Sequence, residues 1–127
     1  NRVNSTLDPT AHAETEAIRD AARNLKDSRL VGCALYTTCE PCPMCCGATL
    51  WAGIDTLVIG TRHASIRIFS RGRFDLGEYS AERLAELTGF KLKIVTGVMS
   101  AECDAMYRDW EGWGAYPLRG GTHAQAD

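Results

Sequence analysis

The chain has 127 residues, 45% of them hydrophobic, which is enough to bury the core of one globular domain but not of two. Its formal net charge is -2, and no block of lysine and arginine indicates a polyanionic partner. No apolar run approaches the roughly 20 residues of a membrane span, and no secretory pattern is present, so we expect a cytoplasmic protein without membrane contact.

The first predicted helix runs from about residue 9 to about residue 25. Asp8 suits the N-cap position and Pro9 the first helical position, and small apolar residues then recur every three or four positions. His12 and Glu14 would lie in the first turn of this helix. Because side chains two residues apart diverge around a helix, both can approach one metal ion only over the helix end.

A predicted buried strand at residues 30–37 leads into a cysteine-rich motif. Pro41 suits the first position of a second helix, which we expect to end near Ala52. Cys42 and Cys45 would then both lie at the start of this helix, with their sulfur atoms on one side of its first turn.

The remainder of the chain continues the alternation of strands and helices. A second buried strand is predicted at residues 56–60, and the long arginine-rich link at residues 61–79 is interpreted as a rim or lid over the site. The later predicted elements are a helix at residues 81–87, a strand at 91–96 and a helix at 101–110. We therefore expect one layered α/β domain at residues 1–111, followed by a loosely held tail at 112–127.

The cysteine motif and the preceding histidine have the composition of a catalytic zinc site. Two cysteines separated by two residues supply two thiolate ligands, and His12 supplies a third ligand. Three protein ligands leave one position open for water, as catalytic zinc requires, whereas structural zinc has four protein ligands. Glu14 is then the expected proton carrier, because the water needs a base and an amine leaving group needs an acid.

Two further cysteines leave an alternative open. Cys39 and Cys46 lie beside the proposed ligands, and four of the six cysteines fall within eight positions, which favours metal binding over disulfides. If Cys39 or Cys46 were a fourth ligand, the zinc would be structural. The chain would then be an interaction module without catalysis.

The motifs His12-x-Glu14 and Pro41-Cys42-x-x-Cys45 resemble the signature of the zinc-dependent cytidine deaminase superfamily. The longer strings at residues 8–14 and 39–45 resemble the branch that contains guanine deaminases, other purine deaminases and tRNA adenosine deaminases. The resemblance covers most of residues 1–110. It implies a three-layer fold with a mixed central sheet flanked by helices, one Zn²⁺ per chain and a homodimer.

The resemblance also implies substrate contacts. Asn1 falls where this branch carries an asparagine that hydrogen-bonds the base, and the backbone of Ala13 is a second expected contact. Trp51 could stack on a base, although a core aromatic is an equally common role at such a position. Asp75 could be a second proton carrier, although surface charge is the more common role. Members of this branch usually carry a helix and two strands ahead of the segment where this chain begins.

The predicted reaction is hydrolytic deamination with release of ammonia, in which Glu14 moves the protons. Because the chain is slightly acidic, a purine base or nucleoside, guanine-type first, is the expected substrate. The alternative is the wobble adenosine of tRNA, since a local patch of arginines could bind RNA despite the net charge. The arginines that could form such a patch are Arg62, Arg67, Arg71, Arg73 and Arg83.

Overall fold

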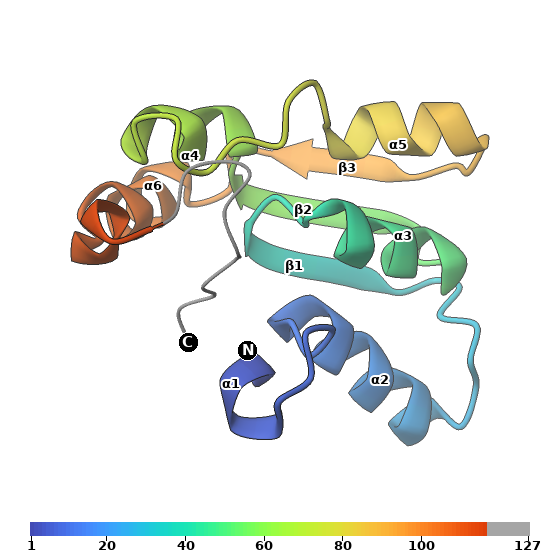
Figure 1. Ribbon diagram of the computed structural model, residues 1–127. Coiled ribbons are helices and arrows are strands. Elements are labelled where there is room, and N and C mark those ends of the chain that lie inside the picture. The colour runs from blue at the N-terminus through green and yellow to red at the C-terminus, as the bar shows by residue number, and fades with distance from the viewer. Residues whose placement is uncertain (117–127) are drawn as a thin grey trace.

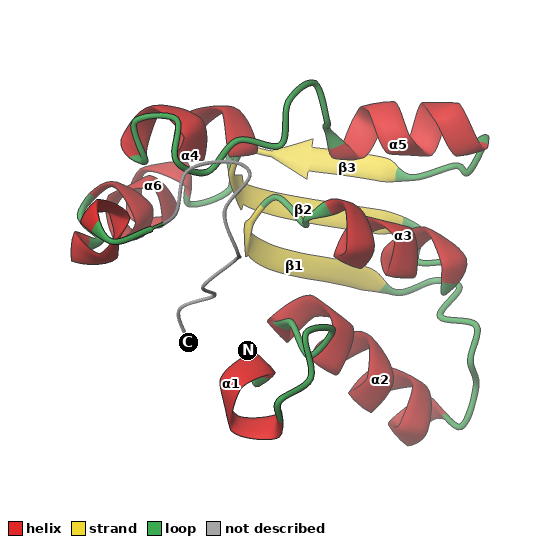
Figure 2. Cartoon of the chain, in the orientation of Figure 1, coloured by secondary structure: helices red, strands yellow, loops and turns green. Residues whose placement is uncertain are grey.

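The computed structural model describes residues 1–116, which form a three-stranded parallel sheet with helices on both faces (Figures 1 and 2). The strands are β1 (Ala34–Cys39), β2 (Thr56–Thr61) and β3 (Lys93–Thr96), and they lie in the order β1-β2-β3. All of the residues of β2 except Thr56 are buried, because β2 is the central strand and is covered on both faces.

One face of the sheet carries the main hydrophobic core. Leu35 of β1 pairs in register with Leu57 of β2, and both side chains pack against three helices. The three helices of this layer are α2 (Ala13–Leu25), α3 (Pro43–Trp51) and α5 (Ala81–Thr88). In Figure 1, α3 crosses in front of β1 and β2.

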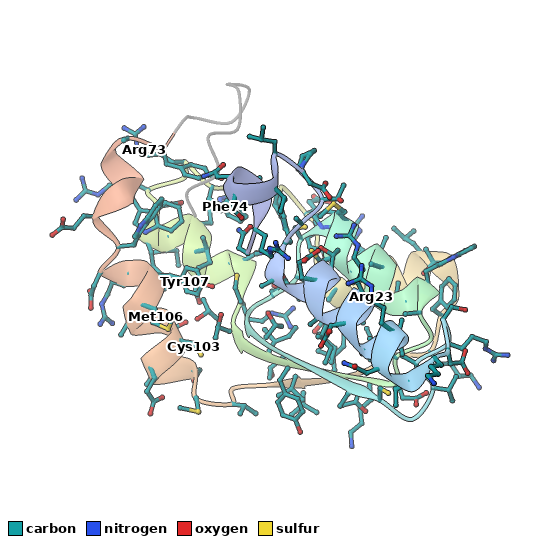
Figure 3. All side chains as sticks on the ribbon, turned by 90° about the horizontal axis from the view of Figure 1, so that it is seen from below. Arg23, Arg73, Phe74, Cys103, Met106 and Tyr107 are labelled. Atoms are coloured by element: carbon teal, nitrogen blue, oxygen red, sulfur yellow. The ribbon has the colours of Figure 1, made fainter. Side chains whose placement is uncertain are left out.

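The opposite face is covered in part by α6 (Ser100–Arg108). Successive residues of a strand point to opposite faces, so Ile59 of β2 faces the main core and Gly60 faces α6. A Cβ atom built on Gly60 would contact the side chain of Cys103, one of the residues labelled along α6 in Figure 3. The helix α4 (His63–Phe69) also packs against α6. The expected three-layer α/β fold is therefore confirmed.

The start of the first long helix differs from the prediction. The helix α2 begins at Ala13 rather than near residue 9, because the side chain of Asp8 accepts hydrogen bonds from the backbone N–H of Thr10 (2.8 Å) and from its hydroxyl (2.7 Å). These bonds close a turn instead of capping a helix. A separate short helix, α1 (Val3–Thr6), lies ahead of the first predicted element.

Three other boundaries also differ from the predictions. The helix α3 begins at Pro43 rather than Pro41, with Cys42 as its N-cap. The strand β1 begins at Ala34 rather than residue 30, because Gly32 has a positive φ of 80° and turns the chain before the strand. The link at residues 61–79 contains α4, so it is not wholly irregular.

The later elements match their predictions closely, and α5, β3 and α6 each lie within two residues of the expected bounds. The three described strands are all parallel, so the antiparallel partner that a mixed sheet requires is not among them. A short 3₁₀ helix, η1 (Glu111–Gly114), crosses the boundary predicted between residues 111 and 112. That boundary stays a prediction, and residues 117–127 of the predicted tail lie outside the described part. Within residues 1–116, no helix is long and apolar enough to cross a membrane.

The contact between Gly60 and α6 gives a test of the packing. In Gly60→Ala the new methyl group would lie 2.8 Å from the carbonyl oxygen of Thr38 and 2.9 Å from the Cβ of Cys103. We expect the free energy of unfolding in urea to fall by about 1–3 kcal/mol, because the backbone of β1 must move. Gly47→Ala is the matched control: its Cβ would meet no atom within 4 Å, and it should stabilise α3 by roughly 0.5–1 kcal/mol. Equal stability of the two variants would contradict this account of the packing.

Candidate metal centre

The amino termini of α2 and α3 meet at one place, and the proposed ligands lie there. His12 is the N-cap of α2 and Cys42 is the N-cap of α3, and both have extended backbones, with ψ values of 155° and 168°. Cys45 lies in the first turn of α3. The turn before α2 is held by the hydroxyl of Thr15, which donates to the carbonyl oxygens of Thr10 and His12.

The distances between these side chains match those between ligands of one tetrahedral zinc ion. The Nδ1 atom of His12 lies 3.6 Å from the sulfur of Cys42 and 3.5 Å from the sulfur of Cys45. Zinc bonds of about 2.3 Å to sulfur and about 2.0 Å to nitrogen, at a tetrahedral angle, separate the two atoms by about 3.5 Å. All ligand atoms of the three residues lie within 4.8 Å of one another, and no other such group occurs within residues 1–116. The residues therefore fit one zinc ion.

The electrostatics of the two cysteines favour a negative charge at this place. The pKa of Cys42 is lowered to about 6, mainly because the thiol of Cys45 donates a hydrogen bond to its thiolate; burial opposes this shift, and the backbone N–H groups of Cys45 and Met44 add to it. The same hydrogen bond, together with burial, raises the pKa of Cys45. The hydrogen bond between the two sulfurs thus favours the thiolate form of Cys42, and a zinc ion takes both sulfurs as thiolates.

Glu14 lies beside this group without joining it. Burial raises the pKa of Cys39 to about 12, and the negative charge of Glu14 raises it further. The charge of Glu14 also helps to raise the pKa of Cys45, after the hydrogen bond and burial. The carboxylate is therefore close enough to act electrostatically on a ligand, yet it is not among the clustered ligand atoms. This placement suits a proton carrier better than a fourth ligand.

The two other cysteines of the motif do not reach the group. Cys39 ends β1 and forms a hydrogen bond with Tyr107, whereas Cys46 is fully buried in the main core beside the hydroxyl of Tyr79. Neither belongs to the cluster of ligand atoms. The geometry thus supports three protein ligands rather than the closed site of a structural zinc.

The predicted substrate contacts divide into two groups. Ala13 is the first residue of α2, so its N–H has no acceptor within the helix, and Asn1 is held nearby because the N–H of Arg2 donates to the carbonyl oxygen of Ala11 (2.8 Å). Trp51, by contrast, is 84% exposed at the far end of α3 and contacts Phe90. The structure does not bring Trp51 to the metal group.

Asp75 lines a cavity of about 540 Å³ together with His63, Arg67 and Tyr79. Its carboxylate lies 3.5 Å from the Nε of Arg67, which is the arrangement of a surface ion pair. None of the three metal ligands lines this cavity. A role for Asp75 as a second proton carrier stays a prediction.

Two residues that contact the segment around the cysteine motif were missed in the sequence. Tyr107 of α6 places its hydroxyl 3.2 Å from that of Thr38, and burial raises its pKa to about 12, with a contribution from Glu14 (Figure 3). No motif marks this tyrosine. Glu40 is only 3% exposed, and its only signal in the sequence is its place inside the cysteine motif.

The comparisons with known proteins agree with this site. Residues 1–61 match the family described as the cytidine and deoxycytidylate deaminase zinc-binding region. A tRNA-specific adenosine deaminase from Buchnera aphidicola is 39% identical over 103 residues, a match that covers 81% of this chain and 63% of that protein. The chain thus spans less than two thirds of the length of this relative.

Two solved structures share the fold. A guanine deaminase from Nitrosomonas europaea superposes with a TM-score of 0.72 at 28% identity, covering 91% of this chain and 63% of that one. A deaminase that edits A34, the wobble position of tRNA, superposes with a TM-score of 0.60 at 29% identity, covering 84% of this chain and 72% of that one.

Metal analysis of single variants tests the ligand set. We expect His12→Ala, Cys42→Ala and Cys45→Ala each to lose zinc, because a site with two protein ligands binds the ion far more weakly. Cys39→Ser and Cys46→Ala should retain one zinc per chain and serve as controls for cysteine loss. Loss of zinc from either control would instead indicate a closed, structural site.

Proposed function

Because the chain belongs to the zinc-dependent cytidine deaminase superfamily, we propose that it catalyses hydrolytic deamination of an amino-substituted purine. The observation that carries this proposal is the group of His12, Cys42 and Cys45 with the carboxylate of Glu14 beside it. Zinc bound by these three residues supplies the Lewis acidity that makes water a nucleophile near neutral pH.

Glu14 performs the proton transfers of the proposed reaction. Its carboxylate takes a proton from the water whose oxygen attacks the ring carbon that bears the amine. The protonated side chain returns this proton to the ring nitrogen. The carboxylate then takes the proton of the new hydroxyl group on the ring carbon and passes it to the amine, which leaves as ammonia when the carbon–nitrogen bond breaks. Water and the aminopurine are consumed, and the oxo-purine and ammonia are released. One carboxylate thus serves as both base and acid.

The proposed first substrate is a guanine-type base or nucleoside. Three of the five arginines that could form a basic patch are paired with acidic side chains in the structure, which lowers the positive charge that RNA phosphates would meet. These pairs are Arg62 with Glu82 (2.6 Å), Arg67 with Asp75 (3.5 Å) and Arg83 with Glu78 (2.9 Å). The net charge of -2 supports the same choice.

The second candidate substrate is the wobble adenosine of tRNA. The observation that favours it is the 39% identity with a tRNA-specific adenosine deaminase over 103 residues. For either substrate we propose that Asn1 and the backbone N–H of Ala13 contact the base. A homodimer and a cytoplasmic location, which were expected from the sequence, also stay predictions.

Replacing the proton carrier tests the mechanism. We expect Glu14→Gln to retain zinc while the rate of ammonia release falls by about 10² or more, because the amide cannot accept the proton. Glu16→Gln is a control on the same helix, since Glu16 instead pairs with Arg19 (2.6 Å). Normal turnover by Glu14→Gln would show that another group moves the protons.

A substrate panel separates the two candidates. Ammonia release should be measured with guanine, guanosine, adenine, adenosine, cytosine, cytidine and a tRNA anticodon stem-loop, each at low and at high salt. We expect turnover of guanine or guanosine that salt does not change, because no phosphate contacts are involved. Turnover of the stem-loop alone, with a steep loss as salt is raised, would establish the tRNA candidate instead.

A further inference from the structure

Glu40 is a buried carboxylate inside the loop that carries Cys42. Its side chain is 2% exposed, and it accepts hydrogen bonds from two backbone N–H groups, that of His63 (2.9 Å) and that of Ala81 (2.9 Å). The Nε of Arg62 also lies 3.2 Å from the same carboxylate. Three donors from the segment at residues 62–81 therefore converge on one acidic side chain.

The two backbone donors are the first residues of α4 and α5. N–H groups at the start of a helix have no acceptor within it, and a buried carboxylate is costly unless donors surround it. The carboxylate therefore provides the acceptors that the N–H groups lack, and the N–H groups stabilise its buried charge. Because Glu40 is two residues from Cys42, these bonds tie both helix starts to the metal-binding loop.

Two further hydrogen bonds hold the same loop. The N–H of Glu40 donates to the carbonyl oxygen of Thr61 (2.7 Å), and the hydroxyl of Tyr79 donates to the carbonyl oxygen of Pro41 (2.7 Å). Cys42 itself precedes the first residue of α3, so α3 alone does not set the position of its sulfur. The conformation of residues 40–41 is thus determined from outside that helix.

We propose that Glu40 is a positioning residue, which with the hydroxyl of Tyr79 holds the loop so that the sulfur of Cys42 meets His12 and Cys45 at zinc-binding distance. The two ends of the 62–81 segment act as a clamp on the metal loop, in place of the rim or lid that its length suggested. Any effect of this clamp on turnover rests on the proposed deaminase function, whereas its effect on metal binding does not.

The test is the zinc affinity of the full chain, measured by competition with a chelator, for Glu40→Gln. The amide places an NH₂ group against a backbone N–H, so at least one donor loses its acceptor. We expect the zinc dissociation constant to rise by about 10-fold to 100-fold, the usual effect of losing a group that orients a metal ligand. The visible spectrum of the cobalt-substituted protein should also change, because it reports the coordination geometry.

Glu82→Gln is the matched control. Glu82 bonds the same Arg62 (2.8 and 2.6 Å), and the substitution makes the same chemical change, yet the carboxylate of Glu82 is half-exposed and, at the start of α5, interacts with Ser80 rather than with residues 40–42 of the metal loop. Its zinc affinity should equal that of the unmodified chain. Tyr79→Phe removes the bond to Pro41 and the interaction with the thiol of Cys46, which is not a proposed ligand, and should raise the zinc dissociation constant by about 2-fold to 10-fold.

Unchanged zinc affinity and an unchanged cobalt spectrum in folded Glu40→Gln would overturn the proposal, as would an equal loss of affinity in Glu82→Gln. If circular dichroism shows that Glu40→Gln does not fold, Tyr79→Phe decides, and wild-type zinc affinity in that variant would refute the clamp. A further outcome is that the unmodified chain deaminates no purine while Glu40→Gln binds zinc more weakly than both the unmodified chain and Glu82→Gln. In that case the proposed function fails and the positioning role stands.

Discussion

The structure depends on the meeting of two helix amino termini. His12 and Cys42 occupy N-cap positions, where the backbone is extended and the side chain is directed over the helix end. Partial positive charge at both helix ends favours the thiolate forms of the cysteines. The arrangement that leaves backbone N–H groups without helical acceptors therefore also supports anionic metal ligands. Glu14, one residue into α2, then lies beside the ligands rather than among them.

The parallel sheet brings the starts of α3 and α4 to one edge. In a parallel sheet the carboxyl ends of all strands lie at one edge, and the helices that follow the strands begin there. The helix α3 follows β1 directly, and α4 follows β2, so Cys42 and His63 start their helices at neighbouring places. Glu40 joins these places through its buried carboxylate, while Gly60 allows α6 to approach the opposite face of β2. The site is thus a product of strand order as much as of motif.

Surface charge in this protein is organised largely in local pairs. Arg62, Arg67 and Arg83 each lie against a carboxylate, although in the sequence they form part of an arginine-rich run that could serve RNA. A run of arginines therefore does not by itself produce a basic surface, because acidic residues of the same segment can fold against it. These pairs lower the positive charge that an approaching phosphate would meet.

The sequence by itself predicted the three candidate ligands, which the structure groups together, and the order of most elements. Spacing was sufficient for Cys42 and Cys45 because they share one turn, and hydrophobic periodicity was sufficient for α5, β3 and α6. Only the tertiary structure decided that α2 begins at Ala13, that Trp51 lies away from the ligands, and that Glu40 bonds the starts of α4 and α5. The physical reason is the separation, along the chain, of the residues that contact one another. Local patterns report contacts between near neighbours in the chain, whereas a buried carboxylate is satisfied by donors about 20 and 40 residues away, which no local pattern encodes.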